Sequence, residues 1–86
     1  MSLRTDLYAD ITGFLLAKCD ADPDELSLES DLYYDIGIDS LDLVFMGQTL
    51  QGAYGISMDD ERIGSLRTVG DVLDFVVSKI ETKAVA

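Results

Sequence analysis

The chain has 86 residues, enough for one domain, and 48% of them are hydrophobic, enough for a packed core. Seventeen acidic residues against six basic ones give a formal net charge of −11. This charge repels nucleic acids and anionic membranes and attracts basic protein surfaces or cations, so it excludes a nucleic-acid-binding protein. Histidine is absent, which removes the commonest general base and the usual zinc ligand. The sequence therefore predicts no catalytic activity of its own and no metal site.

The single cysteine, Cys19, excludes an internal disulfide and a thiolate metal cluster. We interpret it as a small, buried or half-buried apolar side chain. No apolar run approaches the ~20 residues of a membrane span. The N-terminal stretch alternates charged and apolar residues, as an amphipathic helix does and a signal peptide does not. We therefore expect a monomeric, cytoplasmic protein without a membrane span.

A first helix is predicted over residues 3–18, because apolar residues recur there at helical spacing and Ser2 can cap the start. Its core-facing residues are predicted to be Leu3, Leu7, Ile11, Phe14 and Leu15. Residues 19–39 break the pattern and are predicted to form a long loop, a feature that is usually functional in small domains. Three leucines are expected to pin this loop to the core: Leu26, Leu28 and Leu32.

A second helix is predicted over residues 40–54, with Asp39 as N-cap and Asp42 at the reciprocal position of a capping box. Gly55 is expected to end it, because glycine adopts the left-handed conformation common after a helix. At ~100° per residue, the core-facing set is Leu43, Met46, Gly47, Leu50, Ala53 and Tyr54. The outward set is Leu41, Phe45, Gln48 and Gly52, with Val44 at its margin. Two large apolar residues on an outward face are unusual in so small a domain.

A short helix is predicted over residues 59–63, capped by Ser57, and a last helix is predicted to start at Thr68 with Asp71 sharing its cap. The tail from about Thr82 is expected to fray. The inner face of the last helix is predicted to be Val69, Val72, Leu73, Val76 and Ile80. The predicted fold is all-α: one domain over residues 1–86, ordered from about 3 to 81. It is an irregular bundle of three main helices and one short helix, with a long loop between the first two.

Ser40 is predicted to be the first residue of the second helix, directly after Asp39. Its hydroxyl would lie beside the free amides of the first turn and at the positive end of the helix dipole. Both features suit a phosphate group. A serine that another enzyme modifies needs no base of its own, so the absence of histidine fits a substrate. We interpret Ser40 as the anchor of a phosphodiester.

The residues around Ser40 read Asp-Ile-Gly-Ile-Asp-Ser-Leu over 35–41 and resemble the attachment motif of acyl carrier proteins, Asp-Leu-Gly-x-Asp-Ser-Leu. The resemblance covers about residues 3 to 81. Leu28 and Leu32 are similar to the family's spaced loop leucines. Three further stretches resemble the family's helix boundaries: Tyr54-Gly55-Ile56, residues 56–60, and Thr68-Val69-Gly70-Asp71.

This resemblance implies an acyl-carrier-like bundle in which Ser40, flanked by Asp39 and Leu41, accepts 4′-phosphopantetheine from coenzyme A. A phosphopantetheinyl transferase that uses Mg²⁺ would attach it, and the terminal thiol would carry acyl groups as thioesters to enzymes of fatty-acid or polyketide synthesis. The resemblance assigns a partner-facing surface to Asp39, Leu41, Asp42, Val44, Phe45 and Gln48. A hollow that could shelter an acyl chain would be lined by Leu43, Met46, Leu50, Ile63 and Val72.

The second helix departs from the family's pattern. Members typically carry a ladder of glutamates there, whereas Phe45, Gln51 and Gly52 stand at such positions. Asp42 is the only acid after Ser40 on that helix. This predicts partner enzymes, of the acyltransferase or ketosynthase kind, whose docking surfaces are basic or partly apolar. The Tyr54-Gly55-Ile56 stretch resembles carriers of dissociated polyketide synthases.

Three alternatives remain. Asp20, Asp22 and Asp24 fall at positions 1, 3 and 5 of an EF-hand calcium loop, but Glu25 and Asp31 replace its glycine and final glutamate, and a proline interrupts it. Loose divalent-cation binding by this acidic loop, or by Asp59, Asp60 and Glu61, is the nonspecific form of the same alternative. An acidic helical adaptor would keep the fold without the arm. An aminoacyl or peptidyl carrier would keep the arm with another cargo.

Overall fold

The computed structural model describes residues 2–18 and 21–85, and in these ranges the chain is helical with no strand. Cys19 and Asp20 lie outside the described residues, so the interpretation of Cys19 stays a prediction. The main helices are α1 (Leu3–Lys18), α2 (Ser40–Tyr54) and α4 (Val69–Val85), and α3 (Asp60–Gly64) is the short one. The predicted all-α fold with three main helices and one short helix is confirmed.

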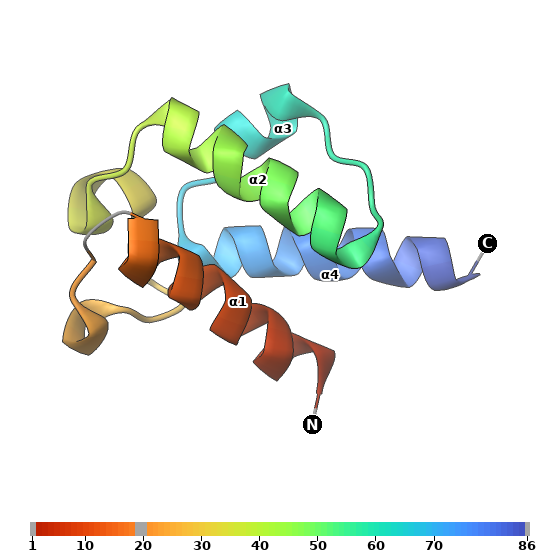
Figure 1. The fold of residues 1–86 in the computed structure, drawn as a ribbon, viewed down its shortest axis with the longest axis horizontal. Coiled ribbons are helices and arrows are strands. Elements are labelled where there is room, and N and C mark those ends of the chain that lie inside the picture. Colours follow the sequence, from red (N-terminus) through yellow and green to blue (C-terminus); the bar gives the residue numbers. More distant parts are fainter. Residues whose placement is uncertain (1, 19–20, 86) are drawn as a thin grey trace.

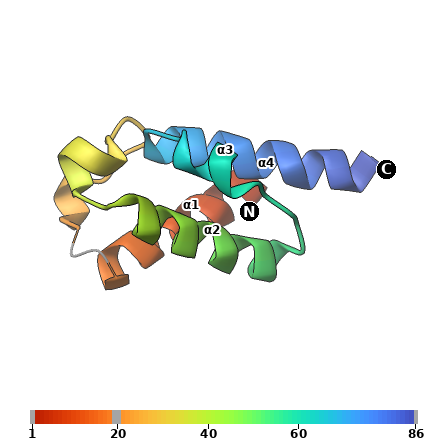
Figure 2. The same ribbon diagram turned by 90° about the horizontal axis from the view of Figure 1, so that it is seen from above.

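The helices form two layers, as Figures 1 and 2 show. Figure 2 places α2 and the later turns of α1 on one side of the molecule, with α4 and α3 on the other. The shortest extent of the molecule is 19 Å. That thickness is close to two helix diameters, each roughly 10 Å. A two-layer domain has one core between its layers, so every helix buries one face only.

The core follows the predicted helical stripes. From α1 the buried residues are Leu7, Ile11 and Leu15, whereas Leu3 and Phe14 are half-buried. From α2 they are Leu43, Met46, Gly47 and Leu50. From α4 they include Val69, Val72, Leu73 and Val76, with Ile80 half-buried. The buried residues of the three helices form one apolar cluster. The spacing of apolar residues therefore predicted the core-facing side of each helix correctly.

The prediction for Ala53 was wrong, because Ala53 is exposed and Tyr54 is half-buried. Ala53 lies at the rim of a hollow between α1 and α2, and its single methyl group leaves that space open. Its position on the helical wheel is correct, but no side chain packs over it. A wheel gives the direction of a side chain and not the presence of a neighbour.

The predicted caps are confirmed at three helices. The Ser2 hydroxyl accepts from the amide of Thr5 at 3.1 Å. The capping box of α2 is complete. At α4, the hydroxyl of Thr68 accepts from the amide of Asp71 at 3.0 Å. Gly55 ends α2 in the left-handed region with φ of 64°.

The cap of α3 differs from the prediction. Asp59, and not Ser57, caps this helix, and its carboxylate accepts from the amide of Glu61 at 3.0 Å. The helix begins one residue later than predicted, at Asp60, so the side chain in capping position is an aspartate. Helix α4 continues past Thr82 to Val85.

The long loop between α1 and α2 contains two short helices, η1 (Pro23–Glu25) and η2 (Leu32–Ile36). Neither has an apolar period long enough to be recognised. Leu32 is buried and Leu26 is partly buried, as predicted, but the Leu28 side chain is 45% exposed. Leu28 fastens the loop through its backbone instead, since its carbonyl accepts from the amide of Gly70 at 2.8 Å.

Candidate functional site

Ser40 is the first residue of α2 and its side chain is exposed. Asp39 precedes it in extended conformation and accepts from the amide of Asp42 at 2.8 Å, while the Asp42 carboxylate accepts from the amide of Asp39 at 3.4 Å. Both carboxylates are engaged in the cap. The Ser40 hydroxyl therefore stands at a fixed helix start, reachable from solvent, where first-turn amides and the helix dipole favour an anion.

The chain enters this helix through a tightly held turn. Gly37 ends η2 with φ of 83°, in the left-handed region that glycine adopts without strain. The amides of Gly37 and Ile38 both donate to the carbonyl of Leu32 at 3.0 Å. Ile38 is 5% exposed and anchors the turn in the core. Gly37, the glycine of the motif, thus adopts the left-handed backbone conformation of the turn. Ile38, two positions before Ser40, anchors the turn in the core.

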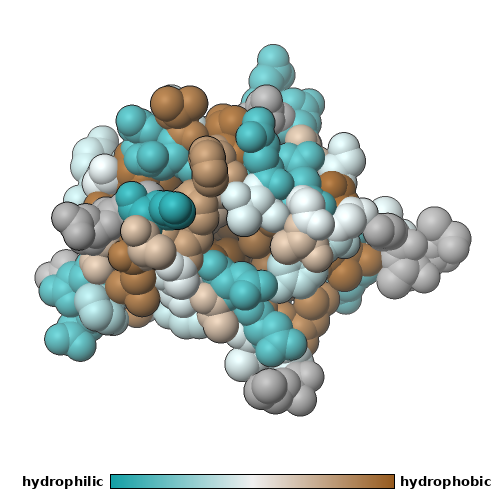
Figure 3. Space-filling model, in the orientation of Figure 1, coloured by the Kyte–Doolittle hydropathy of each residue, from teal (hydrophilic) through white to brown (hydrophobic). Residues whose placement is uncertain are grey.

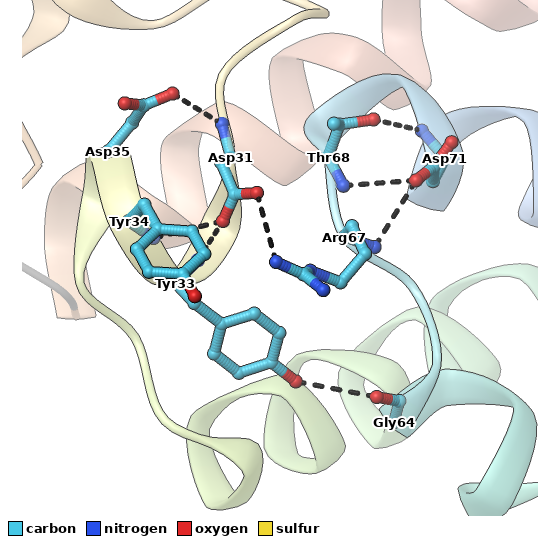
Figure 4. A network of polar contacts seen from close by, with 8 residues as sticks. All are labelled: Asp31, Tyr33, Tyr34, Asp35, Gly64, Arg67, Thr68 and Asp71. Atoms are coloured by element: carbon cyan, nitrogen blue, oxygen red, sulfur yellow. Dashed lines mark hydrogen bonds and ion pairs between the residues drawn. The ribbon is translucent and has the colours of Figure 1, made fainter.

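Asp31 organises the beginning of η2, as Figure 4 shows. Its carboxylate accepts from the amides of Tyr33 and Tyr34 at 2.8 and 2.9 Å, and its own amide donates to Asp35 at 2.7 Å. The Tyr34 amide is the main cause that holds the pKa of Asp31 below its ordinary value; the Tyr33 amide and the Arg67 guanidinium lower it further, and desolvation opposes them. Asp31 is therefore ionised at neutral pH and serves as the cap of η2.

Arg67 joins η2 to the segment between α3 and α4. Its guanidinium carbon lies 5.6 Å from the ring centroids of both Tyr33 and Tyr34, and a nitrogen lies 3.5 Å from the Asp31 carboxylate. The Arg67 carbonyl accepts from the amide of Leu32 at 2.7 Å. Figure 4 shows this network together with the hydroxyl of Tyr33 pointing toward the Gly64 carbonyl. The loop before Ser40 is thus fastened to the start of α4.

The predicted partner-facing residues lie together at the outward face and first turns of α2. Leu41 is 75% exposed and Phe45 is 56% exposed. Asp39 and Gln48 are exposed, whereas Asp42 and Val44 are half-buried. The surface in Figure 3 carries brown hydrophobic atoms over the beginning of α2 among teal hydrophilic ones. Two exposed apolar side chains beside two carboxylates make a mixed apolar and acidic surface next to Ser40.

The five residues predicted to line an acyl hollow are all buried and belong to one cluster. They are Leu43, Met46, Leu50, Ile63 and Val72. A Cβ placed on Gly47 would lie 2.5 Å from Cδ1 of Ile63, so the Ile63 side chain fills the notch that this glycine leaves in α2. Ile63 thereby closes the contact between α2 and α3. Met46 and Leu50 also line an open hollow on the opposite side, toward α1.

Sequence reasoning did not single out Phe14 of α1 and Arg67 as functional residues. The Phe14 ring lies 5.8 Å from that of Phe45, centroid to centroid, so α1 contributes to the apolar surface around α2. Phe14 stands on the predicted core stripe, and no local pattern distinguishes a residue at the edge of a stripe from one at its centre. Arg67 is one of two arginines, with Arg62, that follow the base-free residues 19–61, and nothing in that pattern singles it out.

Asp20, at position 1 of the calcium-loop alternative, lies outside the described residues, so the structure describes only the later part of that loop. Pro23–Glu25 forms a 3₁₀ turn, and the Asp22 carboxylate accepts from the amide of Asp24 at 2.9 Å. Within the described ranges, no group of three or more acidic, cysteine or histidine side chains is placed to hold a metal ion. None of the helices in the same ranges combines the length and the apolar character needed to cross a membrane.

Comparison with known proteins gives a consistent picture. Residues 9–76 match the protein family described as the phosphopantetheine attachment site. An acyl carrier protein of Coprothermobacter proteolyticus is 31% identical over 80 residues, which cover 93% of this chain and 98% of that protein. One from Treponema denticola is 34% identical over 74 residues, covering 86% and 95%.

Two solved structures share the arrangement of helices. The crystal structure of an acyl carrier protein from Thermotoga maritima superposes with a TM-score of 0.79 at 25% identity, covering 93% of each chain. The solution structure of a hexanoyl carrier from the actinorhodin polyketide synthase of Streptomyces coelicolor gives a TM-score of 0.70 at 26% identity, covering 91% of this chain and 90% of that one.

Proposed function

Because the chain belongs to the phosphopantetheine-attachment family of acyl carrier proteins, we propose that Ser40 is the residue that bears its 4′-phosphopantetheine arm. The family's members are carriers and not catalysts, and this cofactor defines them. The observation that carries the assignment is the exposed hydroxyl of Ser40 at the first position of a capped 15-residue helix. When attached, the arm supplies a thiol that holds acyl groups as thioesters.

The residues around Ser40 fit this group. The phosphate would lie beside the first-turn amides of α2, where the helix dipole favours a negative charge. The Asp39 carboxylate accepts from the amide of Asp42 and so keeps the helix start in place. The chain has no histidine, so we assign the base that removes the Ser40 proton to the transferase. This chain contributes the nucleophilic oxygen and its orientation.

The proposal includes a monomeric, cytoplasmic carrier that docks through the outward face of α2. The proposed contact residues are Asp39, Leu41, Asp42, Val44, Phe45 and Gln48. The exposure of Leu41 and Phe45, and the scarcity of acids along this face, favour a partner surface that is apolar at its centre and basic at its rim. A specialised carrier of the polyketide type suits this surface better than the general carrier of fatty-acid synthesis. In the arrangement of helices, the likeness to the actinorhodin carrier is no greater than that to the Thermotoga maritima carrier, so this choice rests on the surface of α2.

The acyl cargo is proposed to rest against the apolar interior formed by Leu43, Met46, Leu50, Ile63 and Val72. Their apolar character supports this, because an aliphatic chain gains about 0.8 kcal/mol for each methylene removed from water. The hollow beside Met46 and Leu50 offers the nearest open space.

The attachment site is tested by incubating the protein with coenzyme A, Mg²⁺ and a promiscuous phosphopantetheinyl transferase, followed by intact mass spectrometry. We expect the wild-type chain to gain one phosphopantetheine and Ser40→Ala to gain none. Ser57→Ala is the matched control, since Ser57 is also exposed but lies outside the motif. A folded wild-type chain that gains no mass, or a Ser40→Ala chain that does, would refute the assignment.

The docking preference is tested with Phe45→Glu and, as control for the added charge, Gln48→Glu. Both side chains are exposed on the same face, so both variants should fold. We expect Phe45→Glu to lower kcat/KM about tenfold with an acyltransferase from a dissociated polyketide system, which corresponds to about 1.4 kcal/mol. The Gln48→Glu variant should change it far less. Equal kinetics for wild type and Phe45→Glu would contradict an apolar docking centre.

A further inference from the structure

The turn η2, which leads the chain toward Ser40, has little apolar packing of its own. It is five residues long, and Leu32 is its one fully buried side chain. Tyr33 and Ile36 are half-buried, and the Tyr34 side chain is 83% exposed. A helix this short is not stable in water without tertiary contacts. The conformation of η2 therefore depends on groups from elsewhere in the chain.

The side chain of Arg67 makes three contacts of this kind. Its guanidinium carbon lies 5.6 Å from the ring centroids of both Tyr33 and Tyr34, and one of its nitrogens lies 3.5 Å from the Asp31 carboxylate. Figure 4 shows the Arg67 guanidinium among these three side chains. A flat, delocalised guanidinium stacks on aromatic rings while it donates to a carboxylate, whereas a lysine ammonium acts as a point charge. Arg67 thus holds both ends of the first turn of η2.

Backbone hydrogen bonds continue this link toward the serine. The Arg67 carbonyl accepts from the amide of Leu32 at 2.7 Å. The Leu32 carbonyl in turn accepts from the amides of Gly37 and Ile38 at 3.0 Å. Ile38 stands two positions before Ser40. A continuous set of contacts therefore runs from the segment between α3 and α4 to the turn that precedes the serine.

The first turn of α2 is fixed by other groups. Its capping box joins Asp39 and Asp42 within the helix, and Ile38 is buried. Loss of the Arg67 side chain leaves both features in place and loosens only the approach over residues 33–37. A stable protein interface covers roughly 800 Å² on each partner, so an enzyme that reaches the exposed Ser40 also meets the exposed residues that lead to it.

We propose that Arg67 is a positioning residue for the transfer of phosphopantetheine to Ser40, because it presents residues 33–39 to the transferase in one conformation. This inference rests on the proposed function of Ser40. In the transfer, the serine oxygen bonds to the phosphorus next to the pantetheine of coenzyme A, adenosine 3′,5′-bisphosphate leaves, and the serine proton goes to the base of the transferase. A segment already held in its bound form loses less conformational entropy on binding, so Arg67 strengthens docking and leaves the chemical step unchanged.

The test compares two arginine variants as substrates of a promiscuous phosphopantetheinyl transferase with coenzyme A and Mg²⁺. Arg67→Gln removes the guanidinium and keeps the backbone carbonyl that Leu32 uses. Arg62→Gln is the matched control, because the Arg62 guanidinium lies 5.7 Å from the Phe75 ring centroid and so makes the same kind of contact at another ring. Each exposed cation–π contact is worth a factor of roughly two to five, so we expect Arg67→Gln to raise KM for the carrier about fivefold with kcat unchanged. Arg62→Gln should change neither constant.

Amide hydrogen exchange measures the loosening of the turn directly. In Arg67→Gln, the amides of Gly37 and Ile38 should exchange about fivefold faster, while that of Leu50 in α2 should keep its rate. Tyr34→Ala is a second variant, and its exposed position lets the chain fold. It should raise KM about twofold, since one of the two ring contacts is lost. Tyr34→Phe keeps the ring and should match the wild type.

The outcomes separate this inference from the function on which it rests. A wild-type chain that gains no mass refutes the proposed function and the inference with it. A modified wild-type chain together with an unchanged KM for Arg67→Gln refutes the inference alone, even if Tm falls, because a purely structural contact changes Tm and not KM. An equal rise of KM in Arg62→Gln refutes it as well. If Arg67→Gln does not fold, equal KM values for Tyr34→Ala and Tyr34→Phe refute it.

Discussion

Two glycines of α2 make a matched pair for testing how closely α2 and α3 are packed. A Cβ added at Gly52 would meet no atom within 4 Å, whereas one added at Gly47 would lie 2.5 Å from Cδ1 and 3.3 Å from Cγ1 of Ile63. Alanine in place of glycine inside a helix stabilises by ~0.5–1 kcal/mol when there is room. Extra atoms forced into a packed core cost ~1–3 kcal/mol.

We therefore expect Gly52→Ala to raise the free energy of unfolding. The free energy of unfolding of Gly47→Ala should be about 1–3 kcal/mol lower than that of Gly52→Ala. Urea titrations followed by far-UV circular dichroism measure both values. Thermal unfolding should separate the two variants by several degrees, since 1 kcal/mol shifts Tm by roughly 4–8 °C in a domain of this size.

The shortest contact belongs to Cδ1 of Ile63, so Ile63→Val removes it. Alone this change should cost ~0.5–1.5 kcal/mol. In the Ile63→Val background, Gly47→Ala should stabilise the fold nearly as much as Gly52→Ala does. A double-mutant cycle measures this difference as the coupling energy between positions 47 and 63. If Gly47→Ala stabilises the wild-type chain as much as Gly52→Ala does, the notch is not filled and the closed contact between α2 and α3 is wrong.

Three further predictions concern caps and protons. Asp39→Ala should lower the free energy of unfolding by about 1 kcal/mol, while Asp39→Asn, which keeps an acceptor for the amide, should lose much less in urea titration. The Tyr34 amide is the main group that lowers the pKa of Asp31 in the folded protein. The stability that Asp31 contributes is therefore complete above its ordinary pKa of 3.8, and it is lost as pH falls through the lower pKa of the folded state. Acid titration of Asp31→Asn should lack that loss. Burial and Asp10 raise the pKa of Tyr54 from 10.0 to about 12, so its contribution is complete below pH 10 and is lost as pH rises toward 12. Urea midpoints of Tyr54→Phe should not show this alkaline loss.

Local patterns predicted the main helices and the position of Ser40 correctly, because the signals involved are local. The period of apolar residues identified α1, α2 and α4, and the N-cap at Asp39 located the start of α2 to the residue. The αL glycine at Gly55 was recognisable for the same reason. Each of these depends on side chains within four positions of one another, which a single sequence displays.

What escaped prediction depends on contacts between distant segments. The turn η2 is held by Arg67, more than thirty positions away, and by an amide of Leu32 that bonds to the Arg67 carbonyl. The exposure of Ala53 and the pairing of Phe14 with Phe45 depend on how α1 lies against α2. Neither relation follows from the spacing of residues along the chain. The position of Ser40 at the start of α2 was therefore predictable, whereas the surface that surrounds it required the fold.

The way in which the helices pair has a mechanical consequence. α2 packs chiefly on α3 and α1 chiefly on α4, so the boundary between α1 and α2 runs between two halves of the molecule. Backbone hydrogen bonds join residues 28–32 with residues 67–70 near the start of α4. Widening this boundary breaks side-chain contacts such as Tyr54 with Asp10, but no hydrogen bond within a helix. The seam between α1 and α2 is thus closed by side chains alone, and every turn of helix is independent of it.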